Sequence, residues 1–322
     1  MIHIARESMP PKISIYSEIS PKFNNMSKAE FEREEAIRFF SDPKKFCGNK
    51  KLTKDSFSFK IYKDPDLARE LELVFGKKCA YCDSGFAHVT PKDIEHFRPK
   101  SEVKLQTGSS LVPGYYWLAG DWENLLVSCP DCNRARKHTV SGQSEKVTLG
   151  KETQFPLSDE ANRVRSHTAP ISLEESCRLL LNPCIDQPEE HLTYDENGLI
   201  LPKSEANGSE SRRGKVSIDT YALQRKALVE ERKKVLNEVL FDIESTRRAL
   251  IEFNQLQQIP GTESIQSQKL DDIKRLRSHL KERFDPLAPY IGMIRDYVKR
   301  TKASGGFNDL IKNGVDPESL LK

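Results

Sequence analysis

Four of the seven cysteines fall into two matched pairs that could hold a metal ion. Cys79 and Cys82 form the first pair, Cys129 and Cys132 form the second, and two residues separate the thiols of each pair. This spacing lets one tight turn direct both sulfurs at one ion, and two such turns complete a tetrahedral zinc site. A redox Cys-x-x-Cys usually stands alone before a helix, so the doubling favours zinc. Because a site of four cysteines is closed, we expect this zinc to be structural.

Three short polar segments lie between the cysteine pairs or directly after the second pair. They read Asp93-Ile94-Glu95-His96-Phe97-Arg98-Pro99-Lys100, then Asp121-Trp122-Glu123-Asn124-Leu125, then Cys132-Asn133-Arg134-Ala135-Arg136-Lys137. Hydrolysis of a phosphodiester bond requires an activated water molecule and a cation on the developing charge. The imidazole of His96 is neutral near pH 7 and can take a proton from water, so His96 is the candidate general base.

The order of these elements resembles the HNH (ββα-metal) endonuclease family in its zinc-bound, four-cysteine form. The resemblance rests on Glu-His-x-x-Pro from Glu95, Asn-Leu from Asn124, and Asn-Arg-x-x-Lys from Asn133. It implies that Glu95 and Asn133 bind a catalytic Mg²⁺ or Mn²⁺, and that Asn124 fixes the loop that presents His96. A carboxylate and an amide oxygen are ligands that suit these ions.

Two positions depart from the commoner form of this motif. Asn133, which we expect to begin a helix, replaces the last histidine, and Glu95 is one methylene longer than the usual aspartate. His138 lies five residues past Asn133, a spacing that does not place both side chains on one helical face. We therefore expect His138 at the surface or beside a phosphate rather than as the missing ligand.

A longer set of segments resembles the HNH subunits of Septu-type and retron-linked anti-phage systems, which act beside an ABC-type ATPase. The segments are HFRPKS, YYWLAGDWENLL, SCPDCNR, FPL and LLLNPCIDQPEEHL, and the likeness extends over about residues 78–219. It implies an effector that cleaves DNA and an ATPase partner, which we expect to dock on the C-terminal helices. The expected phosphate contacts are the basic residues of the motif: Arg98, Lys100, Arg134, Arg136 and Lys137. A solvated helical turn is the alternative for the last three.

Two other classes of protein stay open at this point. One is a zinc treble-clef adaptor that binds nucleic acid or protein without catalysis, and it would need only the cysteines. The other is a stand-alone restriction-type nuclease. A dedicated sequence-reading module in the chain would favour this alternative. The joint presence of Glu95, His96, Asn124 and Asn133 favours an active nuclease over the adaptor.

The helices that precede the motif can be predicted from periodicity and from capping residues. Ser27 and Glu30 form a capping-box pattern for a helix over 27–40. A second helix is expected over 64–75, and it stops at Gly76.

After the motif, the chain is expected to form a hairpin and then a helical domain. Asn197-Gly198 lies between β-favouring runs and marks the hairpin turn. From Ser217 onward, apolar residues recur at helical spacing until the break at Pro260-Gly261. The remaining expectations are a flexible linker over 203–215 and helices over 263–283 and 286–301.

These elements predict an α+β protein with a zinc-stapled ββα-metal (treble-clef-like) HNH core. We expect a strand and helices over 1–76, the core over 77–160, a β-hairpin extension and linker over 161–216, and helices over 217–322. Two polar stretches of the core, 103–113 and 139–154, are expected to be surface insertions.

The composition indicates a soluble and helical protein. Charged residues make up 31% and hydrophobic residues 37% of the 322 residues. No apolar run is long enough for a membrane span and no signal peptide is evident, so we expect a cytoplasmic protein. The net charge of +3 still allows a nucleic acid partner, because local clusters matter more than the sum. We expect the remaining aromatic and thiol groups of note to be buried: Trp117, Trp122, Cys47, Cys177 and Cys184.

Overall fold

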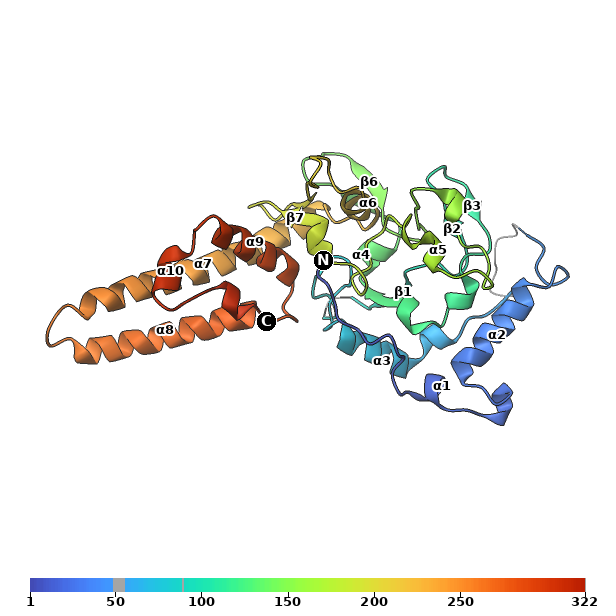
Figure 1. Ribbon diagram of the computed structural model, residues 1–322, viewed down its shortest axis with the longest axis horizontal. Coiled ribbons are helices and arrows are strands. Elements are labelled where there is room, and N and C mark those ends of the chain that lie inside the picture. Colours follow the sequence, from blue (N-terminus) through green and yellow to red (C-terminus); the bar gives the residue numbers. More distant parts are fainter. Residues whose placement is uncertain (49–55, 89, 322) are drawn as a thin grey trace.

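Residues 1–48, 56–88 and 90–321 are described by the structure, a computed structural model (Figure 1). Within them, helices are combined with two-stranded antiparallel sheets, and four cysteines come together beside one of these sheets. The expected mixture of helices and small sheets with a four-cysteine cluster is therefore confirmed. No helix in these ranges has the length and apolar character that a membrane crossing requires.

The first two long helices begin where their capping residues predict. Helix α2 (Lys28–Phe40) starts after Ser27, whose hydroxyl accepts from the Glu30 N–H while the Glu30 carboxylate accepts from the Ser27 N–H. Helix α3 (Pro65–Val74) starts after Asp64, whose carboxylate accepts two backbone N–H groups of the first turn. Both predicted helices are confirmed, because their signals are local.

The expected strand at the N-terminus is wrong. Residues 1–13 run without strand pairing, and the one-turn helix α1 (Ser14–Ser17) follows them. Ile4 donates its N–H to the Pro183 carbonyl at 2.8 Å. Separate contacts of this kind hold the segment against the rest of the protein, so it needs no continuous ladder.

A short antiparallel pair of strands carries the catalytic candidates. β1 (Asp93–His96) pairs with β4 (Leu125–Ser128), and the one-turn helix α4 (Pro130–Asn133) follows β4 directly. Because side chains alternate along a strand, Glu95 and His96 point to opposite faces of this pair.

Both polar stretches that we expected as insertions contain hairpins. β2 (Val103–Lys104) pairs with β3 (Ser110–Leu111), and β5 (Arg136–Thr139) pairs with β6 (Lys146–Leu149). The expected helix from Asn133 onward is wrong: Asn133 ends α4, because the residues after it pair into β5.

The hairpin predicted at Asn197-Gly198 is confirmed. β7 (Leu192–Tyr194) pairs with β8 (Ile200–Pro202), and Gly198 has φ +76. A Cβ at Gly198 would also lie 2.7 Å from the Lys233 backbone nitrogen. Both facts require glycine at this turn.

The flexible linker expected over 203–215 is wrong in its second half. Helix α6 (Arg212–Thr220) begins within it, and the fully buried Ser211 caps that helix by accepting from the Gly214 N–H. The one-turn helix α5 (Ser172–Glu175) precedes this region. The polar composition favoured a linker, but Ser211 and Gly214 are buried and form the start of α6.

Helices α7 (Lys226–Leu256) and α8 (Glu263–Arg283) lie antiparallel and project as a long arm from the rest of the protein (Figure 1). The break at Pro260-Gly261 is confirmed by the turn between them. The third expected helix starts later than predicted, since α9 (Ile291–Ala303) follows Tyr290, which has φ +58. A short α10 (Asn308–Lys312) ends the helical series.

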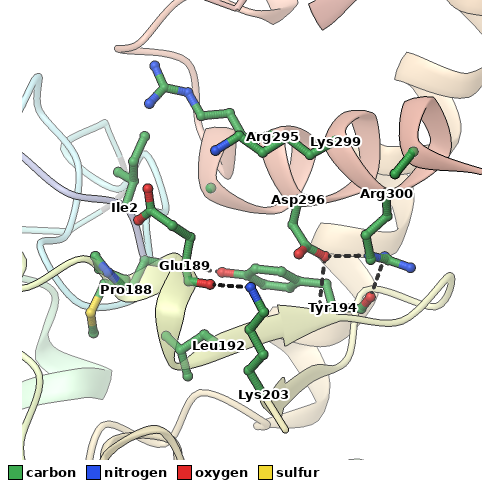
Figure 2. Close-up of a pocket in the computed structure, with 13 residues that line it drawn as sticks. Ile2, Pro188, Glu189, Leu192, Tyr194, Lys203, Arg295, Asp296, Lys299 and Arg300 are labelled. Atoms are coloured by element: carbon green, nitrogen blue, oxygen red, sulfur yellow. Dashed lines mark hydrogen bonds and ion pairs between the residues drawn. The ribbon is translucent and has the colours of Figure 1, made fainter. Parts of the chain in front are cut away.

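Helix α9 is fastened to the β7–β8 hairpin beside a pocket of about 250 Å³ (Figure 2). Asp296 accepts from the Thr193 hydroxyl at 3.1 Å and from the Tyr194 N–H at 3.2 Å. Arg300 pairs with Asp296 at 2.9 Å and donates to the Tyr194 carbonyl at 2.6 Å. The last long helix is therefore bound to the hairpin extension.

One hydrophobic cluster crosses the segment boundaries that we expected at 161 and 217. Its buried members include Phe97, Leu180, Tyr221 and Leu228. A second cluster lies among α7, α8, α9 and α10. The start of the C-terminal helices thus belongs to the same core as the cysteines, and the arm has a core of its own.

The expectation of burial is confirmed for the two tryptophans and wrong for the three cysteines. Trp117 and Trp122 are buried. Cys47 is exposed in the turns after α2, and Cys177 and Cys184 are only partly buried.

Candidate metal centre and catalytic site

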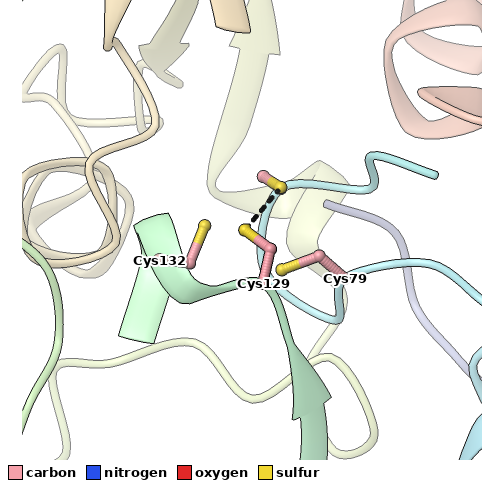
Figure 3. A group of neighbouring side chains, drawn as sticks. Cys79, Cys129 and Cys132 are labelled. Carbon is pink, nitrogen blue, oxygen red and sulfur yellow. Dashed lines mark hydrogen bonds between the residues drawn. The ribbon is translucent and has the colours of Figure 1, made fainter. Parts of the chain in front are cut away.

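The four paired cysteines converge at one point. All four Sγ atoms lie within 4.8 Å of one another, and all four residues are buried (Figure 3). Cys79 and Cys82 come from the turn after α3, Cys129 follows β4, and Cys132 lies in α4. Soft sulfur donors in this number and at this distance fit zinc.

The two cysteine turns are braced on the same strand. Ala80 donates its N–H to the Val127 carbonyl at 2.9 Å, and Asp83 donates its N–H to the Cys79 carbonyl at 3.0 Å. Burial alone would raise the pKa of the Cys82 thiol, but hydrogen bonds from the other cysteines and the nearby Arg225 charge hold that pKa well below its usual value. The cluster therefore favours a thiolate at Cys82, as metal binding requires.

His96 ends β1 and presents one ring nitrogen as a base. Its Nε2 lies 2.9 Å from the Ala119 carbonyl oxygen, which can only accept, so Nε2 carries the proton and Nδ1 keeps its lone pair. The Lys100 ammonium lies 3.3 Å from Nδ1, and the Tyr62 ring meets the imidazole edge to face at 4.8 Å. Burial, aided by the Lys100 charge, lowers the pKa of His96 well below its usual value, so the ring is neutral near pH 7.

Asn124 ties down the loop that follows His96. Its side-chain oxygen accepts from the Arg98 N–H at 2.8 Å, and its amide donates to the carbonyls of Arg98 and Leu118 at 3.0 and 3.1 Å. Asn124 is buried, and all of these partners are backbone groups. This is the arrangement that a loop-fixing amide needs.

Glu95 and Asn133 each contact a residue that sequence reasoning missed. The buried Glu95 carboxylate pairs with the fully buried Lys151, which also donates to the His96 carbonyl at 2.9 Å. Asn133 donates from its amide to the Asp93 carboxylate at 3.1 Å. Burial raises the pKa of Glu95, while the Lys151 charge opposes that shift.

The two missed residues differ in how well they could have been found. Asp93 lies two positions before Glu95 on β1, so strand alternation places both carboxylates on one face. No sequence signal marked Lys151, because the β5–β6 hairpin separates it from the motif.

The five basic candidates occupy different environments. Arg98 is buried between α5 carboxylates, pairing with Glu174 at 2.7 Å and also with Glu175, so it does not face a ligand. Lys100 is held beside His96, and burial lowers its pKa to about 8. The remaining three candidates are exposed: Arg134 pairs with Asp93, Arg136 pairs with Asp131, and Lys137 lies on β5.

The downstream NPCIDQPEEHL segment has an internal role. Asp186 pairs with Arg178 at 2.7 Å and with Arg213 at 2.7 Å. His191 lies 2.8 Å from the Ser211 hydroxyl. These contacts join the segment to α6.

Fold and site thus define a protein of helices and small antiparallel sheets, with a buried four-cysteine cluster that could hold a metal ion at one end of the β1–β4 pair and a buried histidine at the other. No family model matches the chain. The chain is 34% identical over 262 residues to the Septu protein PtuB of Bacillus mycoides, across 79% of this chain and 76% of that relative. It belongs to the Septu PtuB family.

Two further relatives cover smaller parts. The Septu protein PtuA of Bacillus mycoides is 28% identical over 173 residues, which are 53% of this chain and 21% of PtuA. A Vibrio cholerae protein named "Retron Vc95 putative HNH endonuclease" is 23% identical over 177 residues, 55% of this chain and 66% of that protein. The resemblance to Septu and retron-linked proteins is confirmed.

Proposed function

We propose that this chain is a metal-dependent HNH endonuclease that hydrolyses phosphodiester bonds of DNA, as the effector of an anti-phage defence system. The observation that carries the proposal is the buried, neutral His96, whose Nε2 donates to a carbonyl and whose Nδ1 lone pair accepts from the Lys100 ammonium at 3.3 Å, a donor that the attacking water has to replace. The order β1, β4, α4 around the cysteine cluster supports a ββα-metal core. The names of the Septu and retron relatives support the defence role.

In this proposal, His96 takes the proton of the attacking water and Asn124 keeps its loop in place. Glu95 and Asn133 are the proposed ligands of Mg²⁺ or Mn²⁺, which would stabilise the charge that develops on the phosphate. Carboxylate and amide oxygens fit such an ion. Lys151 now holds Glu95, so binding of the ion requires that this pair loosen.

The test is cleavage of plasmid and oligonucleotide DNA by the purified chain, alone and with the expected ATPase. His96→Gln should lower the rate by roughly 10²- to 10⁴-fold, the usual contribution of a general base. His88→Gln is the matched control, because His88 is exposed and outside the site. Zinc content and circular dichroism should be unchanged in both variants.

Two results would contradict the proposal. Full activity of His96→Gln would remove His96 as the base. A wild-type protein that binds nucleic acid but cleaves none, with or without the ATPase, would favour the zinc adaptor instead.

The arm of α7 and α8 is the proposed docking surface for an ABC-type ATPase. It exposes large apolar side chains among many charged ones: Phe241, Ile251, Ile259, Ile265 and Leu270. Apolar groups of this size at the surface of charged helices are typical of a protein interface. Phe241 is the most exposed of these, at 72%.

A docking test has to spare the part of the helical region that packs on the cysteine core. Deleting all residues from 217 would remove Tyr221, which stacks on Tyr81 at 3.8 Å, and would damage the cysteine core. Replacing the arm tip over 252–269 with a short glycine-serine turn leaves that core intact, because Lys269 faces Glu252 across the arm.

The docking test combines this shortened arm with Phe241→Lys, and it measures co-purification with the ATPase. Both changes should reduce complex formation, while Leu173→Lys should not, since Leu173 is 58% exposed but lies on α5. Undiminished binding by both arm variants would exclude the arm as the docking surface. The absence of any ATPase complex with the wild type would favour a stand-alone nuclease.

A further inference from the structure

A basic groove of about 610 Å³ lies between the β5–β6 hairpin and the first turn of α7. We call it the hairpin groove. Its charged and titratable lining consists of Arg136, Lys137, His138, Lys146, Arg225 and Lys226 against Asp131 and Glu230. The cations outnumber the anions, so the groove attracts negative charge.

Both acids of the hairpin groove already have basic partners. Asp131 pairs with Arg136 at 2.8 Å and lies 3.9 Å from Arg225, and Glu230 lies 3.9 Å from Lys226. Within the described ranges, Lys137 and Lys146 form no ion pair. The Nε2 atom of His138 is buried and lacks a hydrogen-bond partner among the same residues. Lys137 and Lys146 are thus available to a ligand.

The hairpin that carries these groups is fixed to α7. Val140 forms an isolated bridge with Arg225, and Ser141 donates its N–H to the Gln224 carbonyl at 2.9 Å. The two walls of the groove therefore keep their spacing. A preformed row of cations suits a ligand with repeated negative charges.

We propose that the hairpin groove binds the sugar–phosphate backbone of the nucleic acid substrate. This inference rests on the proposed nuclease function, and it assigns a role to an insertion that the catalytic residues do not explain. No phenylalanine, tyrosine or tryptophan lines the groove in the described part of the chain, and the one ring there, that of His138, has its Nε2 buried, so the contact is to phosphates and not to stacked bases. Binding should then be insensitive to sequence and sensitive to salt.

The test measures binding of a fluorescein-labelled DNA duplex of mixed sequence by anisotropy, without divalent ions, over a series of salt concentrations. Lys137→Ala/Lys146→Ala should weaken binding about tenfold and lower the salt slope by about two, one for each lost phosphate contact. Lys281→Ala/Lys312→Ala removes the same charge from exposed positions of α8 and α10, and it should change neither quantity.

The outcomes separate this proposal from the nuclease proposal. Unchanged affinity and slope in the Lys137/Lys146 variant overturn the groove alone. Loss of ATPase co-purification with intact DNA binding also overturns it, because the groove would then serve an acidic protein surface. A wild type that binds neither DNA nor RNA overturns both proposals.

A second inference concerns Arg225, which contacts the cysteine cluster itself. One guanidinium nitrogen lies 3.5 Å from the Cys132 sulfur, and another lies 3.6 Å from the Cys82 sulfur and 3.8 Å from the Cys129 sulfur. Arg225 is buried and immediately precedes α7. A zinc ion with four thiolates carries two net negative charges, and a buried guanidinium offsets part of them.

We infer that Arg225 is an outer-sphere partner of the zinc thiolates and fastens the helical arm to the metal centre. Outer partners of metal ligands usually change affinity by 10- to 100-fold when removed. Arg225→Met should therefore release zinc to a chromogenic chelator roughly 10- to 100-fold more readily. Arg225→Lys should fall between the two, because lysine keeps the charge but not the planar donor pair.

The control is Lys226→Met, which removes a neighbouring exposed charge outside the reach of the sulfurs. Zinc release at the wild-type rate from Arg225→Met would overturn the inference. If Arg225→Met does not fold, zinc release from Arg225→Lys is the deciding measurement. Release at the wild-type rate from that variant would overturn the inference as well.

Discussion

The cysteine cluster and the pair Glu95–Asn133 share the β1–β4 strands and α4 as supports, with Cys79 and Cys82 added from the turn after α3, yet only the cysteines converge on one point. Their four sulfurs lie within 4.8 Å. In contrast, Glu95 faces Lys151 and Asn133 faces Asp93. The sulfur cluster is assembled by two tight turns, whereas the side chains of the proposed Mg²⁺ site are bound to Lys151 and Asp93, which a metal ion would have to displace or join.

A basic side chain lies at each of the two sites, but the two side chains act differently. At the cysteines, the neighbouring Arg225 donates to the sulfurs and supports a bound cation's ligands. At Glu95, the neighbouring Lys151 occupies the carboxylate itself. We therefore expect zinc to stay bound at the cysteines, and Mg²⁺ or Mn²⁺ to bind reversibly at Glu95.

The largest expected effect is loss of the sulfur site. Cys132→Ser should give insoluble or unfolded protein, because structural zinc contributes on the order of 10–16 kcal/mol in small zinc domains, as much as a whole domain's stability. Cys47→Ser is the control, since Cys47 is exposed and outside the cluster. Solubility, zinc content and circular dichroism are the measurements. A soluble, folded Cys132→Ser protein without zinc would end the structural-zinc claim.

Breaking the Glu95–Lys151 pair should lower the stability of the protein less than loss of the zinc cluster does. Lys151→Met leaves a buried carboxylate without its partner, which should lower the free energy of unfolding by about 3–5 kcal/mol. Glu95→Gln/Lys151→Met should recover much of that loss. The exposed pair Lys104–Glu152 is the control, and Lys104→Met should change stability by about 1 kcal/mol or less.

Urea unfolding of the single and double variants measures this effect. Wild-type stability in Lys151→Met would show that Glu95 is not committed to the lysine, and that it is already available to a metal ion. The comparison between the two sites would then fail.

The smallest expected effect is on the pH profile of cleavage. The pKa of His96 lies well below 6.5, so the acid limb should fall below that pH. Burial lowers the pKa of Lys100 to about 8, so above pH 8 this lysine loses its charge and attracts the substrate phosphate less. The rate should therefore decline above about pH 8.

Lys100→Arg tests this assignment, because a guanidinium stays charged throughout the range. The alkaline decline should move to higher pH while the acid limb stays in place. A decline that remains near pH 8 in this variant would show that another group controls it.

Local signals predicted well, and contacts between distant segments did not. The cysteine turns, the Ser27–Glu30 capping box and the Asn197-Gly198 hairpin depend on residues within a few positions of one another. Lys151 and Arg225 reach the site from far along the chain, and neither belongs to a motif. The β5–β6 hairpin was expected only as an insertion, since its strands are short and rich in charge.

The central claim is that zinc holds the fold while a different ion serves catalysis at His96. The most direct test removes free divalent ions from the zinc-loaded chain with the proposed ATPase partner present, and then adds Mg²⁺ in steps. The account predicts no DNA cleavage at the start, recovery with added Mg²⁺, and one zinc per chain throughout. Full cleavage before any ion is added, with zinc still bound, would contradict it.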